Sequence, residues 1–242
     1  MSSVHKYRHT AKLITNLGSP EAAHARPRTQ PENLSLDILR TWQSARLAAT
    51  YAELLAQPRY RPACLFFLND VYSAKDFHNR DTEIKHLYEI LHRVLPDALL
   101  VLVKTVIELD SLTNSLDEAL WSTMQAELDV VDGITPGLYA EGYRRCDNYE
   151  ERAYQIELIH QVGHMVETTT RIPMISTLLK LARRPVTLAG WGDLHKWIER
   201  GFSAFLHMHG AHEFLDTIHD RELLILDRIF ENDPNPFAPY LT

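Results

Sequence analysis

Long stretches of helical periodicity dominate this sequence. The longest runs from Asp97 to about Leu128, directly after Pro96, and its first half is apolar around much of its circumference. Such a helix must be surrounded by other helices, because its apolar side chains need partners on several sides. No alternating strand pattern of useful length and no long repeat interrupts the series. The sequence therefore predicts an all-α fold, a single-domain bundle of about eight to nine helices around a long central helix.

Prolines and capping residues set the expected limits of the other helices. Asn33 is a good N-cap for a first long helix, which should end at Pro58. Thr135 followed by Pro136 is a typical helix start, and Asp147 with Glu150 resembles a capping box. The further expected helices cover residues 62–72, 81–95, 135–145, 147–170, 194–208 and 212–231, with two short helices beginning near Pro173 and Pro185.

The first thirty residues differ from the rest in charge and in pattern. They show no sustained period, and they are basic although the whole chain carries a net charge of -7. We therefore predict a flexible basic tail over residues 1–30 and a helical-bundle domain over residues 31–242. Docking of the tail on the acidic body and binding of a partner both remain open. The charged residues of the tail are Lys6, Arg8, Lys12, Glu21, Arg26 and Arg28.

The composition excludes several classes of protein. With 45% hydrophobic and 24% charged residues, the chain can bury an ordinary core and is not disordered throughout. The acidic balance argues against a broad surface for nucleic acid or an anionic membrane. The most apolar run, residues 98–109, is interrupted by Lys104 and Glu108, so no membrane span is expected and a cytoplasmic location follows. Cys64 and Cys146 have no metal-binding spacing and are interpreted as small buried hydrophobes.

Histidine is abundant, with 13 in the chain, and Glu-x-x-His occurs three times. The strongest case is Glu157, His160, His164 and Glu167, whose spacing places all four side chains on one stripe of a helix. Helical-wheel geometry puts this stripe roughly opposite the apolar side at Leu158, so we expect it to face water. A metal site at these four residues is therefore the alternative, and no cofactor is predicted. The same holds for a surface group of His207, His209, His212, Glu213, Asp216 and His219.

Polar residues inside apolar surroundings are the better candidates for a ligand pocket, because burying an unpaired carboxylate costs several kcal/mol. In the long helix, Asp110, Asn114 and Asp117 interrupt a row that is apolar at both ends, so they could face a shared interior pocket. Structural roles, as helix caps or ion pairs, remain the alternative. The full set of pocket candidates is Asp70, Tyr72, Asp76, Arg80, Asp81, Asp110, Asn114 and Asp117, with Arg144, Arg145 and Arg152 as possible guanidinium partners.

Two segments resemble a family of uncharacterised bacterial helical proteins. The first is the run from Phe66 to Tyr72 with Asp76-Phe77 and Arg80-Asp81, and the second is residues 201–205 with Arg221-Glu222. The resemblance covers about residues 35–232 and implies an all-α fold. It implies no activity and no catalytic residue. The Arg221-Glu222 pair itself is interpreted as an interhelical ion pair.

No motif specific enough to name a reaction occurs, so whether the chain is an enzyme stays open. The first expectation is a protein that acts through protein–protein contacts, with self-association as a homodimer as one form. The alternative is an enzyme or sensor on a heme-oxygenase-like or ferritin-like bundle that binds a metal, heme or a small ligand. Nucleic-acid binding through the basic tail is a third and weaker hypothesis.

Overall fold

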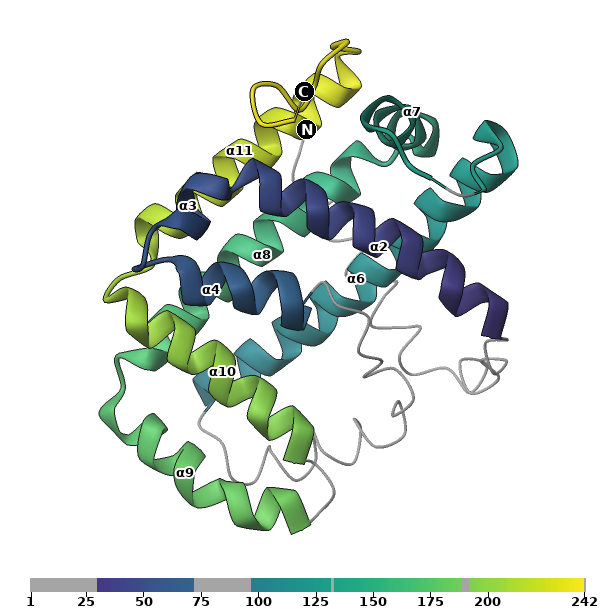
Figure 1. Cartoon of the computed structure of the whole chain (residues 1–242). Coiled ribbons are helices and arrows are strands. Elements are labelled where there is room, and N and C mark those ends of the chain that lie inside the picture. Colours follow the sequence, from purple (N-terminus) through teal and green to yellow (C-terminus); the bar gives the residue numbers. More distant parts are fainter. Residues whose placement is uncertain (1–29, 72–96, 132, 189–191, 242) are drawn as a thin grey trace, which may run out of the picture. The chain divides into compact units, whose positions relative to one another are not determined.

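All regular structure in the described part of the chain is helical. The computed structural model describes residues 30–71, 97–131, 133–188 and 192–241, and no strand occurs among them (Figure 1). The predicted all-α multi-helix bundle is therefore confirmed. Its helices are α2 (Gln30–Thr50), α3 (Ala52–Ala56), α4 (Arg61–Phe66), a π-helical turn (Phe67–Val71), α6 (Asp97–Leu128), α7 (Pro136–Cys146), α8 (Tyr149–Thr170), α9 (Pro173–Leu188), α10 (Gly192–Met208) and α11 (His212–Phe230).

The contacts divide the chain into two compact units, residues 1–34 and residues 35–242. The predicted flexible tail lies almost entirely outside the described residues and stays a prediction. The helix expected over residues 81–95 and the turn before it also lie outside them.

The first helix differs from its expected limits at both ends. It begins at Gln30, so Asn33 lies inside it and is not its N-cap. At Tyr51 the backbone leaves helical geometry, with φ -113° and ψ 26°, and α3 follows as a separate short helix. After α4, the chain winds into the π-helical turn, which contains Phe67 and Leu68. Such turns carry one extra residue per hydrogen-bonded ring and change the direction of the side chains that follow.

The long helix α6 has the predicted limits, and α7 has the predicted start. Thr135 accepts a hydrogen bond from the backbone N–H of Leu138 at 3.3 Å, and Pro136 occupies the first helical position. The capping box expected at Asp147 is wrong. That residue ends α7 in the left-handed conformation, with φ 48°, and Asn148 precedes α8 without a side-chain cap. Asp tolerates this conformation because its short polar side chain can bond locally.

The segment 173–188 forms one helix, α9, instead of two short ones. Pro185 therefore lies in the last turn of α9, and the expectation of a helix starting there is wrong. Among the described helices, none is both long and apolar enough to cross a membrane.

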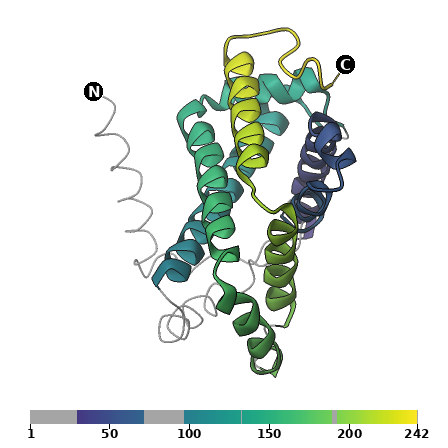
Figure 2. The ribbon, with the colours of Figure 1, turned by 90° about the vertical axis from the view of Figure 1, so that its left-hand side faces the viewer.

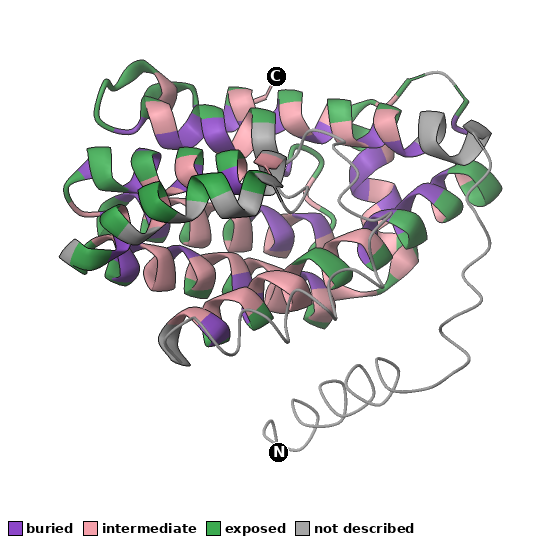
Figure 3. Cartoon of the chain, turned by 90° about the horizontal axis from the view of Figure 1, so that it is seen from below, coloured by how far each residue is buried: buried purple, intermediate pink, exposed green. Residues whose placement is uncertain are grey.

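Helix α8 contacts α6, α9, α10 and α11, so it is covered on several sides (Figure 2). Its approach to α11 depends on Gly163, because a Cβ atom at this position would overlap Leu215 of α11. The Leu215 side chain of α11 thus packs directly on the α8 backbone at Gly163. Purple, buried segments line the inward sides of these helices in Figure 3.

The buried apolar side chains form two clusters. One joins α2, α3, α4, α10 and α11 around Tyr60, Met208 and Phe214, which are at most 2% exposed. The other joins α2, α6, α7 and α11 around Leu39 and around Phe237, which follows α11. Side chains of both clusters line one cavity, so the cavity lies where the two clusters meet.

Candidate functional site

The cavity has a volume of about 120 Å³ and is lined mainly by apolar groups. Its apolar side chains include Leu47, Phe67, Leu68, Phe214, Leu215 and Leu226. Its polar side chains come from α2, α6, α7, α8 and α11 and include two arginines, Arg46 and Arg152. Phe67 and Leu68 belong to the π-helical turn, which thus supplies part of the apolar wall.

A hydrogen-bonded network forms one part of the polar wall. Gln43, 6% exposed, donates through Nε2 to Asp117 at 3.1 Å and to the hydroxyl of Tyr139 at 3.4 Å. The hydroxyls of Tyr139 and Tyr143 are 2.8 Å apart. The guanidinium of Arg152 stacks over the Tyr143 ring, 4.5 Å from its centroid. Burial raises the pKa of Tyr143 well above its ordinary value, so the phenol stays neutral.

Arg152 is 3% exposed but is not hydrogen bonded to a carboxylate of the described residues. It donates to the side-chain oxygen of Gln155 at 3.1 Å and to the carbonyl of Leu116 at 2.9 Å, which are both neutral. The Asp117 carboxylate lies 3.8 Å away, beyond hydrogen-bonding range. Burial raises the pKa of Asp117, although Arg152, Gln43 and Arg40 act in the opposite direction. The charge of Arg152 therefore has Asp117 as its counterion, at ion-pair distance but without a hydrogen bond between the two groups.

Arg46 has a direct partner. Its Nη1 donates to Glu222 of α11 at 2.5 Å, and the hydroxyl of Tyr51 donates to the same oxygen at 2.8 Å. Burial opposes the charged guanidinium, but Glu222 together with Tyr139 and Tyr51 outweighs it and raises the pKa of Arg46. The neighbouring Arg221 pairs with Glu53 of α3 at 2.5 Å. Both members of the Arg221-Glu222 pair therefore make interhelical ion pairs, as the sequence predicts.

Three polar atoms of this wall have no hydrogen-bond partner among the described residues. They are the Oε1 atom of Gln43 and the Nε atoms of Arg46 and Arg152, all inaccessible to bulk water. An unpaired buried polar group costs about 1–3 kcal/mol. Two donors and one acceptor of residues that line the cavity are therefore without a hydrogen-bond partner in the described part of the chain.

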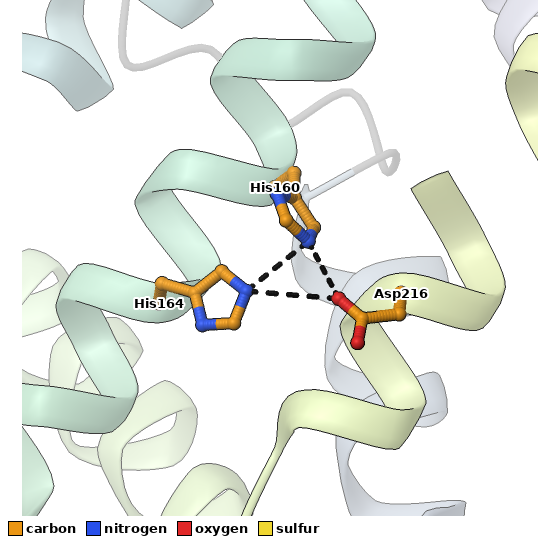
Figure 4. Close-up of side chains that lie close together, drawn as sticks. All are labelled: His160, His164 and Asp216. Atoms are coloured by element: carbon orange, nitrogen blue, oxygen red, sulfur yellow. Dashed lines mark hydrogen bonds and ion pairs between the residues drawn. The ribbon is translucent and has the colours of Figure 1, made fainter. Parts of the chain in front are cut away.

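A second group of side chains lies between α8 and α11 (Figure 4). His160 and His164, one turn apart on α8, point toward Asp216 of α11. The Nε2 atom of His160 is 2.9 Å from Asp216 Oδ1 and 3.1 Å from His164 Nε2, and the remaining side of the triangle is 3.9 Å. The His160 and His164 side chains are 23% and 27% exposed. His160 also lines the cavity.

The expectation that this stripe faces water is therefore wrong. Both histidines are half-buried against α11, and Glu167 is 5% exposed. The stripe and the apolar side of α8 are both covered, because α8 packs on α6 and on α11 at the same time. Glu157, the fourth member, is exposed and lies 3.4 Å from His219.

Local charges favour the neutral imidazole and the ionised carboxylate in this group. Burial, followed by the neighbouring His160 and His212, lowers the pKa of His164. The hydrogen bond with His160 is the main factor that lowers the pKa of Asp216. Burial acts to raise the pKa of Glu167, but hydrogen bonds from the Ala211 backbone and from Arg171 outweigh it and lower this pKa. These protonation states are the ones that bind metals.

The structure separates the pocket candidates of the long helix. Asp117 is 4% exposed and lines the cavity, and its guanidinium neighbour is Arg152, one of the expected arginines. Asn114 lies outside the lining and accepts a hydrogen bond from Arg40 at 2.8 Å. Asp110 is exposed, so its expected interior position is wrong. Asp110, Asn114 and Asp117 follow one another at steps of about one helical turn, and of these three Asp117 alone lines the cavity.

The other candidates fall on residues that the structure does not describe. Asp70 lies in the π-helical turn, but its side chain is outside the described part. Tyr72, Asp76, Arg80 and Asp81 lie outside the described residues altogether. Their assignment to a pocket stays a prediction.

The comparison with known proteins gives one family. Residues 22–236 match the family described as Domain of unknown function (DUF8198). The chain belongs to this family. The DUF8198 match covers most of the chain, so the predicted membership of an uncharacterised helical family is confirmed. No curated protein and no solved structure matches the sequence.

Cys64 lines the cavity of this DUF8198 member, and its reactivity tests how well the cavity is closed. Burial raises the pKa of its thiol to about 11. We expect Ellman's reagent to leave Cys64 unmodified at pH 8 in native buffer, because the thiolate is the reactive form. The Cys146→Ser variant isolates this thiol, since the chain has two cysteines. The measurement is the absorbance released with and without denaturant, and equal rates in both would contradict the expected burial.

Proposed function

We propose that this protein binds a small organic anion, with a carboxylate head and a short apolar body, inside the cavity. The observation that carries the proposal is Arg152. Its guanidinium is 3% exposed, its hydrogen bonds go to neutral acceptors and its counterion Asp117 lies 3.8 Å away, whereas buried charges are normally both paired and hydrogen bonded to their counterion. A ligand carboxylate would supply the charge-assisted hydrogen bond that Asp117 does not make.

The remaining polar atoms fit the same head group. The free Nε donors of Arg46 and Arg152 offer hydrogen bonds to an anionic oxygen. Both arginines line the same cavity as Tyr139 and Tyr143. The free Oε1 atom of Gln43 accepts a bond, so a donor on the ligand or a bound water completes the set.

Volume and lining limit the rest of the ligand. The cavity volume of about 120 Å³ is of the order of the roughly 150 Å³ of an apolar cavity that holds one benzene molecule, so it limits the apolar body of the ligand to one small ring at most. The apolar wall formed by Leu47, Phe67 and Phe214 suits a single ring or a short branched chain. Large groups such as heme do not fit this volume.

The experiment uses benzoate as the probe and benzyl alcohol as its uncharged counterpart. We expect benzoate to raise the melting temperature and to give a saturable calorimetric signal, because it binds the native state only. At one hundred times Kd, such a ligand adds about 2.7 kcal/mol to the free energy of unfolding. Benzyl alcohol should bind at least about tenfold more weakly, since it lacks the charge-assisted bonds.

Two variants locate the binding. Arg152→Lys keeps a buried cation but loses the planar fork, so benzoate affinity should fall by about tenfold or more. Arg183→Lys, an exposed arginine on α9, is the matched control and should change nothing. Ile218→Phe fills the cavity and should remove binding while the circular dichroism spectrum is kept. Equal binding of both probes, or unchanged benzoate binding in Ile218→Phe, would refute the proposal.

Action through protein–protein contacts or self-association, and a cytoplasmic location, are expectations of the sequence that stay predictions. Ligand binding in the cavity is compatible with each of these expectations.

A further inference from the structure

Three potential metal ligands from two helices meet at one point on the α8–α11 boundary. The two histidine nitrogens and the Asp216 oxygen are separated by 2.9, 3.1 and 3.9 Å. A tetrahedral zinc ion with bonds of 2.0–2.2 Å requires ligand atoms about 3.3–3.5 Å apart. The three observed separations bracket this value, so small side-chain rotations would give coordination geometry. Figure 4 shows the three ligand atoms facing one another.

Hydrogen bonding alone does not satisfy these three atoms well. A carboxylate accepts only, so the Nε2 atom of His160 must carry a proton to bond Asp216. If the Nε2 atom of His164 is unprotonated, it competes with Asp216 for this one proton. If it is protonated, two N–H groups face each other. A cation at the centre would instead be bonded by all three atoms at once.

Glu167 supports this arrangement from behind. Its Oε2 atom lies 3.6 Å from the Nδ1 atom of His164, on the side of the ring away from the cluster. Arg171 holds the other oxygen at 2.6 Å, and the Ala211 backbone holds the carboxylate as well. In many zinc sites a carboxylate accepts the remaining N–H of a ligating histidine and so fixes the ring orientation; Glu167 lies on the right side of His164 for this role, at a distance slightly longer than a hydrogen bond.

We propose that His160, His164 and Asp216 bind one divalent first-row transition-metal ion, with at least one coordination position left open. Two imidazoles and one carboxylate are the donor set of zinc and non-heme iron sites, and three protein ligands leave room for water or another molecule. A neighbouring group, His164, Glu167 and His212, is the competing possibility. It is less favourable because Arg171 already compensates Glu167 and its closest approaches are 3.6 and 4.0 Å.

The site lies beside the cavity, since His160 belongs to both. The metal proposal nevertheless rests on the triad geometry and not on the proposed ligand. Benzoate binding and metal binding are measured separately, so each proposal can fail alone.

The experiment uses untagged full-length protein that has been treated with a chelator and dialysed. Co²⁺ is titrated in and the visible spectrum recorded, followed by displacement with Zn²⁺. We expect one Co²⁺ per chain, with absorption bands whose intensity reports the coordination number. His160→Ala, His164→Ala and Asp216→Asn should each lower affinity by more than about 100-fold, the upper range for supporting residues alone.

Matched substitutions on α11 distinguish the competing sites. His212→Ala should keep the Co²⁺ affinity within about threefold, and Asp220→Asn, an exposed aspartate on the same helix, should behave likewise. Asp216 is itself 55% exposed, so Asp216→Asn is expected to fold, which circular dichroism checks. The proposal is overturned if wild-type protein binds no Co²⁺, if all variants bind it equally, or if His212→Ala rather than Asp216→Asn removes binding.

Discussion

Glu222→Ala is expected to lower the free energy of unfolding by about 3–5 kcal/mol, because it leaves Arg46 buried without its counterion. The substitution also removes the acceptor of the Tyr51 hydroxyl. For a chain of this length, the melting temperature should fall by roughly 10 °C. Urea unfolding followed by circular dichroism measures the change.

Glu53→Ala is the matched control. Glu53 pairs with the adjacent Arg221 at the same distance, but its side chain is 50% exposed, and exposed ion pairs contribute at most about 1 kcal/mol. Adding Arg46→Met to Glu222→Ala should restore most of the stability, since the uncompensated charge disappears. If the two glutamate variants lose similar stability, burial is not what makes the Arg46–Glu222 pair important.

Gly163→Ala should destabilise the protein by about 1–3 kcal/mol, although replacing glycine by alanine inside a helix normally stabilises it. Alanine is the better helix former by about 1 kcal/mol. Its methyl group would overlap Leu215, however, and would push α8 and α11 apart. The measurement is again urea unfolding, with the Co²⁺ affinity of the triad as a second readout of the helix spacing.

Gly137→Ala on α7 gives the opposite expectation. A Cβ atom there meets nothing within 4 Å, so the substitution should be neutral or stabilise by about 0.5–1 kcal/mol. Opposite signs for the same change in two helices would identify close helix contact as the cause. A stabilising Gly163→Ala would show that α11 lies farther from α8 than described.

Most of the fold follows from periodicity and helix-end signals. The limits of α6, the Thr135 cap and the start of α11 at His212 agree with expectation, because each is set by local residues. The link between α7 and α8 differs from expectation, because Asp147 adopts a left-handed conformation that ends α7 two residues before α8 begins. Periodicity also cannot show a π-helical turn, which depends on packing.

The candidate site was less predictable. The polar stripe of α8 resembles a solvated surface in sequence, but a helix that packs between two neighbours buries both of its sides. The sequence indicates Asp117 because it interrupts an apolar row, and it indicates Arg152 because an arginine carries the complementary charge. Gln43 and Arg46 are not among the expected pocket residues, although they lie with Leu39 and Leu47 on the buried side of α2. That interruption was the available signal.

The pair between Arg46 and Glu222 joins positions 176 residues apart in the chain. During synthesis, α2 leaves the ribosome before α11 is made. Until then Arg46, on the inner face of α2, lacks its counterion Glu222. Phe237 packs on Trp42 in the same way, from even later in the sequence. The nascent chain therefore cannot close its interior stepwise from the N-terminus, and cooperative collapse has to wait until the last helix has been made.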